Sequence, residues 1–442
     1  MHLAAFLYPT GYHVAAWRLP ETRARMGAEP AAYREMARAC ERACFDFVFL
    51  PDSMAMRGSD VDILSRSAIN YVAQLEPLTL AASLCAATER IGVVASASTT
   101  YNHPFTVARQ ILSLDHVAAG RAGWNLVTSQ NVHEAGNFGR EAHVAHDARY
   151  ARAEAFVDVV TGLWDSFADD AFVCDKPAGR FFDPGKLRAL DHADEHFRVR
   201  GPLNVPRSPQ GRPVVLQAGA SPPGRALAGR TADVVFCAQN EIGAARAFRE
   251  DMRARAAGFG RDPDTIRVLP GVMPIVAPTA AEARAAFERL QALITPEVGL
   301  ALLAGQLGEI DLSGLAVDAP LPELPETLRT DASRSRPALL LERARAAGLT
   351  LQDLYREVAA SRGHLLLVGD AVGVVDELER WVVEGAADGF NVMPAALPGG
   401  LEAFIDLCVP ELRRRGLVRE RYEGTTLREH LGLARPERRV AP

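Results

Sequence analysis

The stretch "IGVVASASTTYNHPFTVARQILSLDHVAAGRAGWNLVTS", residues 91–129, decides the fold class. Residues 91–98 form a short, nearly continuous run of small and β-branched apolar residues, which is typical of a strand covered on both faces. A longer amphipathic segment follows at 104–118, and a second apolar run occupies 122–129. A strand, a helix and another strand in this order predict a unit of parallel sheet with a crossover helix.

The same alternation extends along the whole chain. Eight apolar runs are each followed by an amphipathic segment, and they occupy residues 3–8, 45–50, 91–98, 122–129, 213–219, 232–238, 266–276 and 389–396. Eight such units fit a closed (β/α)8 barrel better than an open doubly wound sheet. The sequence therefore predicts an α/β protein with one TIM-barrel domain over residues 1–442.

Two segments exceed what eight units need. The first, at about 167–212, is rich in Asp, Pro and Gly, and the second spans about 295–370. Insertions of this length within a compact domain commonly carry binding loops or lids. We therefore expect the second segment to cover the substrate region.

Composition excludes several classes of function. The 49 basic and 55 acidic residues give a net charge of −6, which offers no argument for nucleic acid or an anionic membrane as partner. No run approaches the roughly 18–20 apolar residues of a membrane span, and residues 1–13 lack the basic start of a secretory signal. The six cysteines form no C-x-x-C, and His192 and His196 have no third ligand nearby. We expect a cytoplasmic protein without a metal site.

Polar side chains gather at the predicted strand ends, where TIM barrels place their chemistry. These residues are Asp52, Ser98, Thr99, Thr100, Asn125, Thr128, Ser129, Ser221 and Asn391. Burying an amide or hydroxyl without a partner costs about 1–3 kcal/mol, so these groups either pair within the protein or face a ligand. Five strand ends of this kind favour a polar ligand at the barrel mouth.

Two segments offer groups for an anion. In "AGASPPGRALAGR", residues 218–230, Ser221 is a good helix N-cap and Gly219 allows close approach of the backbone. Such a helix start suits a phosphate, although an ordinary capped helix fits the same pattern. His146 and Tyr150 are four residues apart on one helical face, as phosphate donors or as a surface pair.

Other features narrow the chemistry. His13 follows the first predicted strand and should lie at the mouth, with either a structural or a catalytic role. No G-x-S-x-G, P-loop or G-x-G-x-x-G stands at a strand–helix junction. These absences argue against a hydrolase triad, an NTPase and a Rossmann site.

Four long blocks resemble one family in the same order along the chain. They are "ASTTYNHPFTVARQILSLDHVAAGRAGWNLVTS" (97–129), "AHDARYARAEAFV" (145–157), "GPLNVPRSPQGRPVVLQAGASPPGRALAGRTADVVF" (201–236) and "AADGFNVMP" (386–394) with the segments after it. They resemble the flavin-dependent monooxygenases of the bacterial-luciferase-like superfamily. Within it, the group is that of nitrilotriacetate monooxygenase component A, dibenzothiophene-sulfone monooxygenase and long-chain alkane monooxygenase.

The resemblance implies a cofactor and partners. It implies a barrel that binds reduced FMN from a separate NAD(P)H:flavin reductase and activates O2 through a flavin peroxide to oxygenate a small organic substrate. It also implies a homodimer or a homotetramer. Two alternatives stay open: an F420-dependent oxidoreductase of the same superfamily, and a flavin-binding protein without turnover.

The resemblance also assigns residues to the flavin ring. Asp52 matches the family's aspartate after the second strand, and Thr99, beside Ser98, matches a hydroxyl that contacts flavin. Asn125 matches the asparagine that meets the flavin ring.

Further matches assign the phosphate end to His146, Tyr150 and Ser221, with the backbone of Gly219 and Ala220. The family often has two serines before this helix, whereas here the first is Ala220. The loss of one hydroxyl donor predicts weaker retention of FMN.

His13 is the expected catalytic residue, as a proton donor or a group that orients the substrate. The expected substrate pocket is lined by Leu7, Tyr8, Tyr12, Met54, Met56, Phe236 and Met393. These side chains predict a hydrophobic, aromatic or heterocyclic substrate, and the scarcity of basic residues among them speaks against a polycarboxylate.

Overall fold

A computed structural model describes residues 1–307, 311–312, 314–318, 344 and 347–439. Within these residues eight parallel strands close a barrel, because β8 pairs with β9, β9 with β11 and β11 with β1. The strands are β1 (His2–Phe6), β2 (Phe47–Leu50), β3 (Gly92–Ser98), β4 (Ala122–Val127), β7 (Val214–Ala218), β8 (Val234–Cys237), β9 (Arg267–Val276) and β11 (Gly389–Val392). The predicted TIM barrel and all eight of its predicted strands are confirmed.

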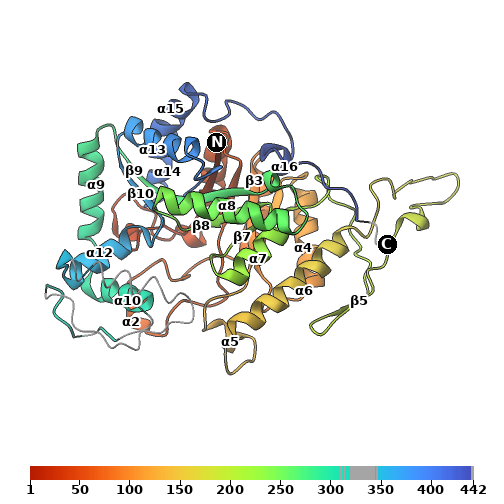
Figure 1. Cartoon of the computed structure of the whole chain (residues 1–442), viewed down its shortest axis with the longest axis horizontal. Helices are drawn as coiled ribbons and strands as arrows, with labels where there is room; N and C mark the ends of the chain where they lie inside the picture. Colours follow the sequence, from red (N-terminus) through yellow and green to blue (C-terminus); the bar gives the residue numbers. More distant parts are fainter. Residues whose placement is uncertain (308–310, 313, 319–343, 345–346, 440–442) are drawn as a thin grey trace.

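Helices surround the barrel (Figure 1). The longer ones are α1 (Pro30–Arg42), α3 (Pro77–Ala87), α4 (Pro104–Val117), α6 (His146–Trp164), α7 (Pro222–Thr231), α8 (Ile242–Gly258), α9 (Ala280–Ala292) and α13 (Ala371–Val383). Shorter ones are α2 (Val61–Ser65), α5 (Glu134–Asn137), α14 (Gly399–Ala403), α15 (Val409–Arg414) and α16 (Leu427–His430). Single turns are η1 (Ala16–Arg18), η2 (Met26–Ala28), η3 (Pro184–Lys186), η4 (Pro263–Thr265) and η5 (Phe404–Cys408).

Local sequence explains where several of these helices start. Pro104 occupies the first turn of α4, where proline costs no hydrogen bond. At α9, Thr279 and Glu282 form a capping box, in which each side chain hydrogen-bonds the backbone of the other. Ser221 caps α7 through the backbone N–H of Gly224, as the sequence predicts.

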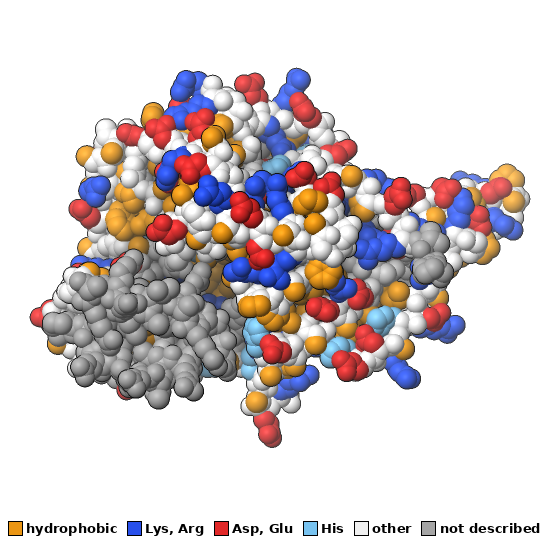
Figure 2. Space-filling model, viewed as in Figure 1, with side chains coloured by type: hydrophobic (Ala, Val, Ile, Leu, Met, Phe, Trp, Pro, Cys, Tyr) orange, Lys and Arg blue, Asp and Glu red, His pale blue; other side chains and the backbone are white. Residues whose placement is uncertain are grey.

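The first predicted insertion extends away from the barrel (Figure 1). It contains the small antiparallel pair β5 (His192–Ala193) and β6 (Arg198–Val199). On the face shown in Figure 2, acidic and basic side chains are interspersed, so neither sign of charge dominates that face.

The second predicted insertion contains three described elements. Helices α10 (Pro296–Gln306) and α12 (Leu351–Ser361) pack against each other, and strand β10 (Leu365–Gly369) follows them. Leu354 and Tyr355 of α12 belong to the same buried cluster as Phe6 and Phe49 of the barrel. The described part of this insertion therefore packs on the barrel mouth.

Strand β10 is an element that the sequence patterns did not indicate. It runs parallel to β9, from Leu365 opposite Val272 to Gly369 opposite Val276. Because Val272 also pairs with Val392, β10 and β11 lie on opposite edges of β9. Strand β8 stops at the pair of Cys237 with Pro270, and β10 takes its place beside the second half of β9.

The opposite end of the barrel is closed by the C-terminal segment. Arg428 of α16 donates two hydrogen bonds to Asp233, at 2.8 and 3.3 Å, and a third to the carbonyl oxygen of Arg212 at 2.9 Å. Both members of this ion pair are buried. Because TIM barrels place their chemistry at the other, C-terminal face, we expect this ion pair to serve stability.

Candidate active site

The amide of Asn125 lies inside the barrel. Its neighbour Trp124 packs outward against Phe156 and Trp164 of α6, so the alternation of a strand turns Asn125 inward. The Asn125 Nδ2 donates to the Oγ of Ser96 at 2.7 Å, and Ser96 stands opposite it on β3. The buried Oδ1 has no hydrogen-bond partner within the described residues.

A second amide shows the same feature from the other side of the barrel. Asn391 on β11 is 1% exposed, and among the described residues neither its Oδ1 nor its Nδ2 has a partner. Gln217 on β7 faces outward, where its Nε2 donates to the carbonyl oxygen of Gly224 in α7 at 3.2 Å, and its buried Oε1 has no partner among the described residues. The barrel end thus presents polar atoms whose hydrogen-bonding capacity the protein itself does not use.

The hydroxyls of Ser98 and Thr99, at the end of β3, are instead bonded within the protein, whereas the buried Thr100 hydroxyl has no partner among the described residues. Ser98 and Ser129 share a hydrogen bond of 2.6 Å between their Oγ atoms, and the Thr99 hydroxyl donates to the carbonyl oxygen of Val127 at 3.2 Å. These bonds join the ends of β3 and β4. The Thr99 oxygen keeps lone pairs with which it can accept a further hydrogen bond.

The starts of α6 and α7 converge on one spot. The Ser221 hydroxyl donates to the Tyr150 hydroxyl at 3.4 Å, and the rings of His146 and Tyr150 lie 5.0 Å apart. A β-carbon at Gly219 would stand 3.5 Å from the Tyr150 hydroxyl, and one at Gly224 would stand 2.9 Å from it. The structure therefore brings the expected phosphate residues together at a capped helix start.

Asp52 follows β2 and lies among other acids. Burial, together with the negative charges of Glu76 and Glu134, raises its pKa to about 7. Glu134, which the sequence did not single out, is 3% exposed and accepts hydrogen bonds from Ser53 Oγ and Met54 N–H at 2.8 and 3.2 Å. These bonds hold the loop after β2 against α5.

The raised pKa makes stability depend on pH. Asp52 binds its proton more tightly in the folded chain than in the unfolded one, where the pKa is about 4, so wild-type stability should fall as pH rises from about 4 to about 7. Asp52→Asn removes this fall. Urea unfolding at pH 5 and pH 8 should show the wild type losing stability relative to the variant at the higher pH. If the difference in unfolding free energy between wild type and variant is the same at pH 5 and pH 8, the raised pKa of Asp52 is contradicted.

His13 is fully buried behind the mouth. Burial and the positive charge of Arg362 lower its pKa to about 3, so the imidazole is neutral near pH 7. Its Nδ1 accepts a hydrogen bond from the backbone N–H of Ala15 at 3.2 Å. The proton of the neutral ring is therefore on Nε2, and the side chain of Gln291 lies near enough to interact with the ring.

Three expected pocket residues meet around a histidine that the sequence did not indicate. His364, just before β10, stacks on Phe236 at 5.3 Å and meets Tyr12 edge-on at 5.5 Å. A β-carbon at Gly271 would lie 2.3 Å from His364 Nδ1 and 2.5 Å from Met393 Sδ. Only glycine at this position leaves room for both side chains.

The other expected pocket residues are placed differently. Met54 and Met56 lie on the loop after β2, where their carbonyl oxygens accept hydrogen bonds from Asn137 and Asn131. Leu7 belongs to the cluster between the strands and the outer helices, so its assignment to the pocket is wrong. Tyr8 belongs to the cluster of the barrel interior and its mouth.

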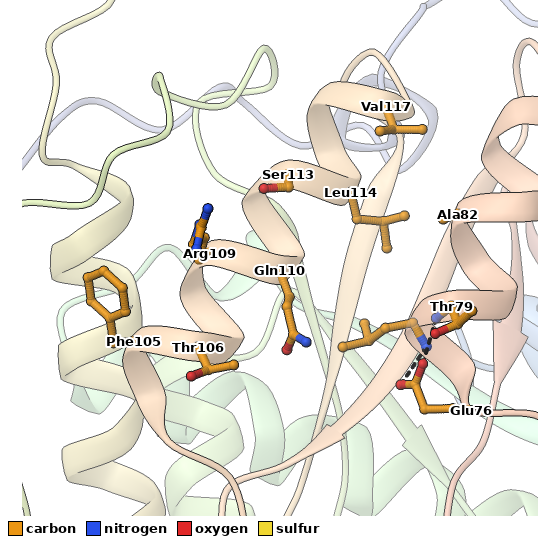
Figure 3. A pocket seen from close by; sticks show the side chains of 11 residues that line it. Glu76, Thr79, Ala82, Phe105, Thr106, Arg109, Gln110, Ser113, Leu114 and Val117 are labelled. Atoms are coloured by element: carbon orange, nitrogen blue, oxygen red, sulfur yellow. Dashed lines mark hydrogen bonds between the residues drawn. The ribbon is translucent and has the colours of Figure 1, made fainter.

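A groove on the outside of the barrel is separate from this site. It has a volume of about 650 Å³, and Figure 3 shows it between α3 and α4. Its lining includes Phe105, Arg109 and Val117 but no residue expected to bind flavin or substrate. The mouth residues, rather than this groove, therefore form the candidate site.

Two further findings concern the described residues as a set. They contain no group of three or more His, Cys, Asp or Glu side chains that could hold a metal ion. None of their helices is both long and apolar enough to cross a membrane. The two histidines considered above as metal ligands lie near acidic side chains: His192 pairs with Asp194, and His196 pairs with Glu195.

Comparison with known proteins adds the family. Residues 6–388 match the family model described as luciferase-like monooxygenase. The chain belongs to this family. This luciferase-like monooxygenase is 47% identical over 439 residues to N-acetyl-S-(2-succino)cysteine monooxygenase of Bacillus subtilis (strain 168), with 99% of this chain and 98% of the relative covered.

Two other comparisons agree. The luciferase-like monooxygenase is 47% identical over 447 residues to nitrilotriacetate monooxygenase component A of Aminobacter aminovorans, with 100% and 98% of the two chains covered. Its fold matches the crystal structure of DmoA from Hyphomicrobium sulfonivorans with a TM-score of 0.88 and 32% identity, covering 98% of this chain and 92% of that one.

Proposed function

We propose that this protein uses reduced FMN, delivered by a separate NAD(P)H:flavin reductase, and O2 to oxygenate a small organic substrate. The proposal is carried by the buried Asn125 Oδ1 and the buried amide of Asn391, which have no partner among the described residues and lie in a barrel of this family. Two relatives with 47% identity over nearly the whole chain are named monooxygenases, and one of them is named a component A. These names favour the flavin and oxygen reaction over F420 chemistry and over a binding protein without turnover.

The residues at the mouth fit FMN at both of its ends. The free Oδ1 of Asn125 suits an N–H on the polar edge of the flavin ring. Tyr150, Ser221 and the backbone N–H groups of Ala220 and Ser221 suit a phosphate, with His146 beside them. These two N–H groups lie just before α7, whose first two residues are prolines without an N–H. Bound reduced FMN would supply the electrons for activating O2.

Ala220 weakens this phosphate end. Its position offers a backbone N–H but no hydroxyl, and its carbonyl oxygen already accepts a hydrogen bond from Arg225 at 2.9 Å. We infer that the protein retains FMN weakly, as suits an enzyme that receives reduced flavin from another protein.

Other side chains are assigned to the ring and the substrate. We place Asp52, Ser98 and Thr99 on the ring side of the flavin, where Thr99 can accept a hydrogen bond. A neutral His13 suits the orienting role, because an imidazole with a pKa of about 3 carries no extra proton to donate near neutral pH.

The second insertion is proposed as the cover that excludes water from the site. Its described helices α10 and α12 already pack on the aromatic side chains of the mouth. Exclusion of water favours transfer of oxygen to the substrate over release of hydrogen peroxide. Residues 308–310, 313, 319–343 and 345–346 of the expected cover lie outside the described residues.

Two properties of the whole protein complete the proposal. We propose a homodimer or homotetramer, which light scattering of the purified protein would measure. We also propose a cytoplasmic location: no disulfide joins the six cysteines, all of which are described, and this pattern suits a reducing compartment.

The proposal is tested by titrating the purified protein anaerobically with oxidised FMN, reduced FMN and reduced F420, and then admitting O2. We expect reduced FMN to bind more tightly than oxidised FMN, and O2 to be consumed with release of hydrogen peroxide when substrate is absent. Binding of F420 but of neither form of FMN would overturn the proposal. Tight binding of FMN without O2 consumption would favour a binding protein without turnover.

A further inference from the structure

Arg57 stands at one end of a run of aromatic rings at the mouth. Its guanidinium carbon lies 5.4 Å from the centre of the Tyr71 ring, and its side chain is exposed. No acidic residue of the described chain forms an ion pair with it. By contrast, Arg66 on the nearby helix α2 pairs with Asp62 at 2.8 Å. Among the described residues Arg57 is therefore a cation without a carboxylate in ion-pair contact, although the charge of Glu134 acts on it from farther away.

Arg362 stands at the other end of the run. Its guanidinium carbon lies 3.9 Å above the Tyr12 ring, and one of its nitrogens donates to the Tyr12 carbonyl oxygen. Its Nε is buried without a partner, and it too forms no ion pair with an acidic residue of the described chain. The backbone of Arg362 has φ 50°, a left-handed conformation that favours glycine. A side chain retained there against that preference points to a use for it.

Tyrosines join the two arginines. Tyr8 meets Tyr71 at 5.5 Å and Tyr12 at 6.2 Å, each ring nearly perpendicular to the next. Burial and Tyr71 raise the pKa of Tyr8, while Arg362 and Arg57 both act to lower it. Both cations therefore lie within electrostatic reach of the same phenol, although they come from segments far apart in the sequence.

We propose that Arg57 and Arg362 bind two carboxylates of the substrate, and that its carbon skeleton lies against Tyr8, Tyr12 and Tyr71. The substrate is thus a small di- or polycarboxylic acid, and this inference rests on the function proposed above. A guanidinium binds a carboxylate with two parallel N–H donors, and stacking on an aromatic ring keeps the guanidinium plane in place. The assignment replaces the expectation of a wholly hydrophobic substrate, which considered neither arginine.

The test measures binding to the FMN-loaded protein by calorimetry. The probes are nitrilotriacetate and N-acetyl-S-(2-succino)cysteine, each compared with its fully methyl-esterified form, which keeps the skeleton and lacks the charges. We expect at least one acid to bind at least ten times more tightly than its ester. The affinity of that acid should fall as salt is raised, because salt screens ionic contacts.

Variants assign the effect to the two side chains. Arg57→Gln and Arg362→Gln should each raise the Kd of the acid about 10- to 100-fold, as expected for loss of a charged hydrogen-bond donor, and leave the Kd of the ester unchanged. Lysine at either position should restore part of the affinity. Arg66→Gln, an exposed arginine with its own carboxylate partner, is the matched control and should leave the acid Kd unchanged.

Each other result overturns the inference. It fails if neither acid binds, if the esters bind as tightly as the acids, or if the glutamine variants bind the acid as the wild type does. It also fails if the variants lose FMN affinity, since the arginines would then serve the cofactor. Titration of the same samples with reduced FMN reports separately on the proposed function, so a protein that binds FMN but not acids loses only the substrate assignment.

Discussion

Replacement of Arg428 by alanine is expected to lower the free energy of unfolding by about 3–5 kcal/mol. The substitution leaves the Asp233 carboxylate buried, with the backbone N–H of Val215 as its remaining partner at 2.9 Å. It also frees the carbonyl oxygen of Arg212, to which Arg428 donates. Urea unfolding of wild type and variant, followed by circular dichroism, measures the loss.

Two comparisons separate the buried pair from a general effect of removing an arginine. Arg380→Ala removes a solvent-exposed ion pair with Glu377 and should cost far less than the change at Arg428. The double variant Arg428→Ala, Asp233→Asn should be more stable than the sum of its two single changes predicts, because no buried charge is left unpaired. A loss at Arg428 no larger than at Arg380 would show that the pair does not hold the C-terminal segment.

Asn125→Leu is expected to weaken FMN binding about 10- to 100-fold and to leave the folded barrel intact. Leucine fills a similar volume but offers no acceptor to the flavin ring. The substitution removes one hydrogen bond, from Nδ2 to Ser96, which keeps its own bond to the carbonyl oxygen of Leu50 at 2.9 Å. The lost Oδ1 has no partner among the described residues, so stability should fall by only about 1 kcal/mol. Quenching of FMN fluorescence measures the affinity, and thermal unfolding measures the stability.

The control for this change is Asn204→Leu, which makes the same substitution at an exposed position on the first insertion. It should alter neither property. If Asn125→Leu binds FMN as the wild type does, Asn125 does not face the flavin. If it instead melts far below the wild type, the amide serves the fold more than the ligand.

The fold was predictable because each barrel strand is a short apolar run bounded by turn residues, and tertiary packing did not overrule that pattern. Strand β10 could not be predicted in this way, because Leu365–Gly369 lies within a segment whose length suggested an insertion. The sequence also placed Asn125, Tyr150 and Ser221 at strand ends or helix starts, positions that a barrel brings together wherever its loops go.

The substrate side was less predictable for a physical reason. Arg57 and His364 lie in loops, and Glu134 begins the four-residue helix α5, which is too short to show a periodicity. No sequence pattern therefore fixes the directions of these side chains. The environment of His13 depends on Arg362, which only the packing of α12 brings near it. Sequence patterns report which face of a strand or helix is buried, but not which distant loop supplies the neighbouring charge.

The pairing of β10 with β9 has a mechanical consequence. Five residue pairs join the two strands, from Leu365 with Val272 to Gly369 with Val276. The C-terminal end of the second insertion is therefore fixed to strand β9 of the barrel. Arg362 lies three residues before the start of this anchored strand, and it donates a hydrogen bond to the carbonyl oxygen of Tyr12. It is therefore held in position before any substrate arrives, and binding need not spend free energy on immobilising it.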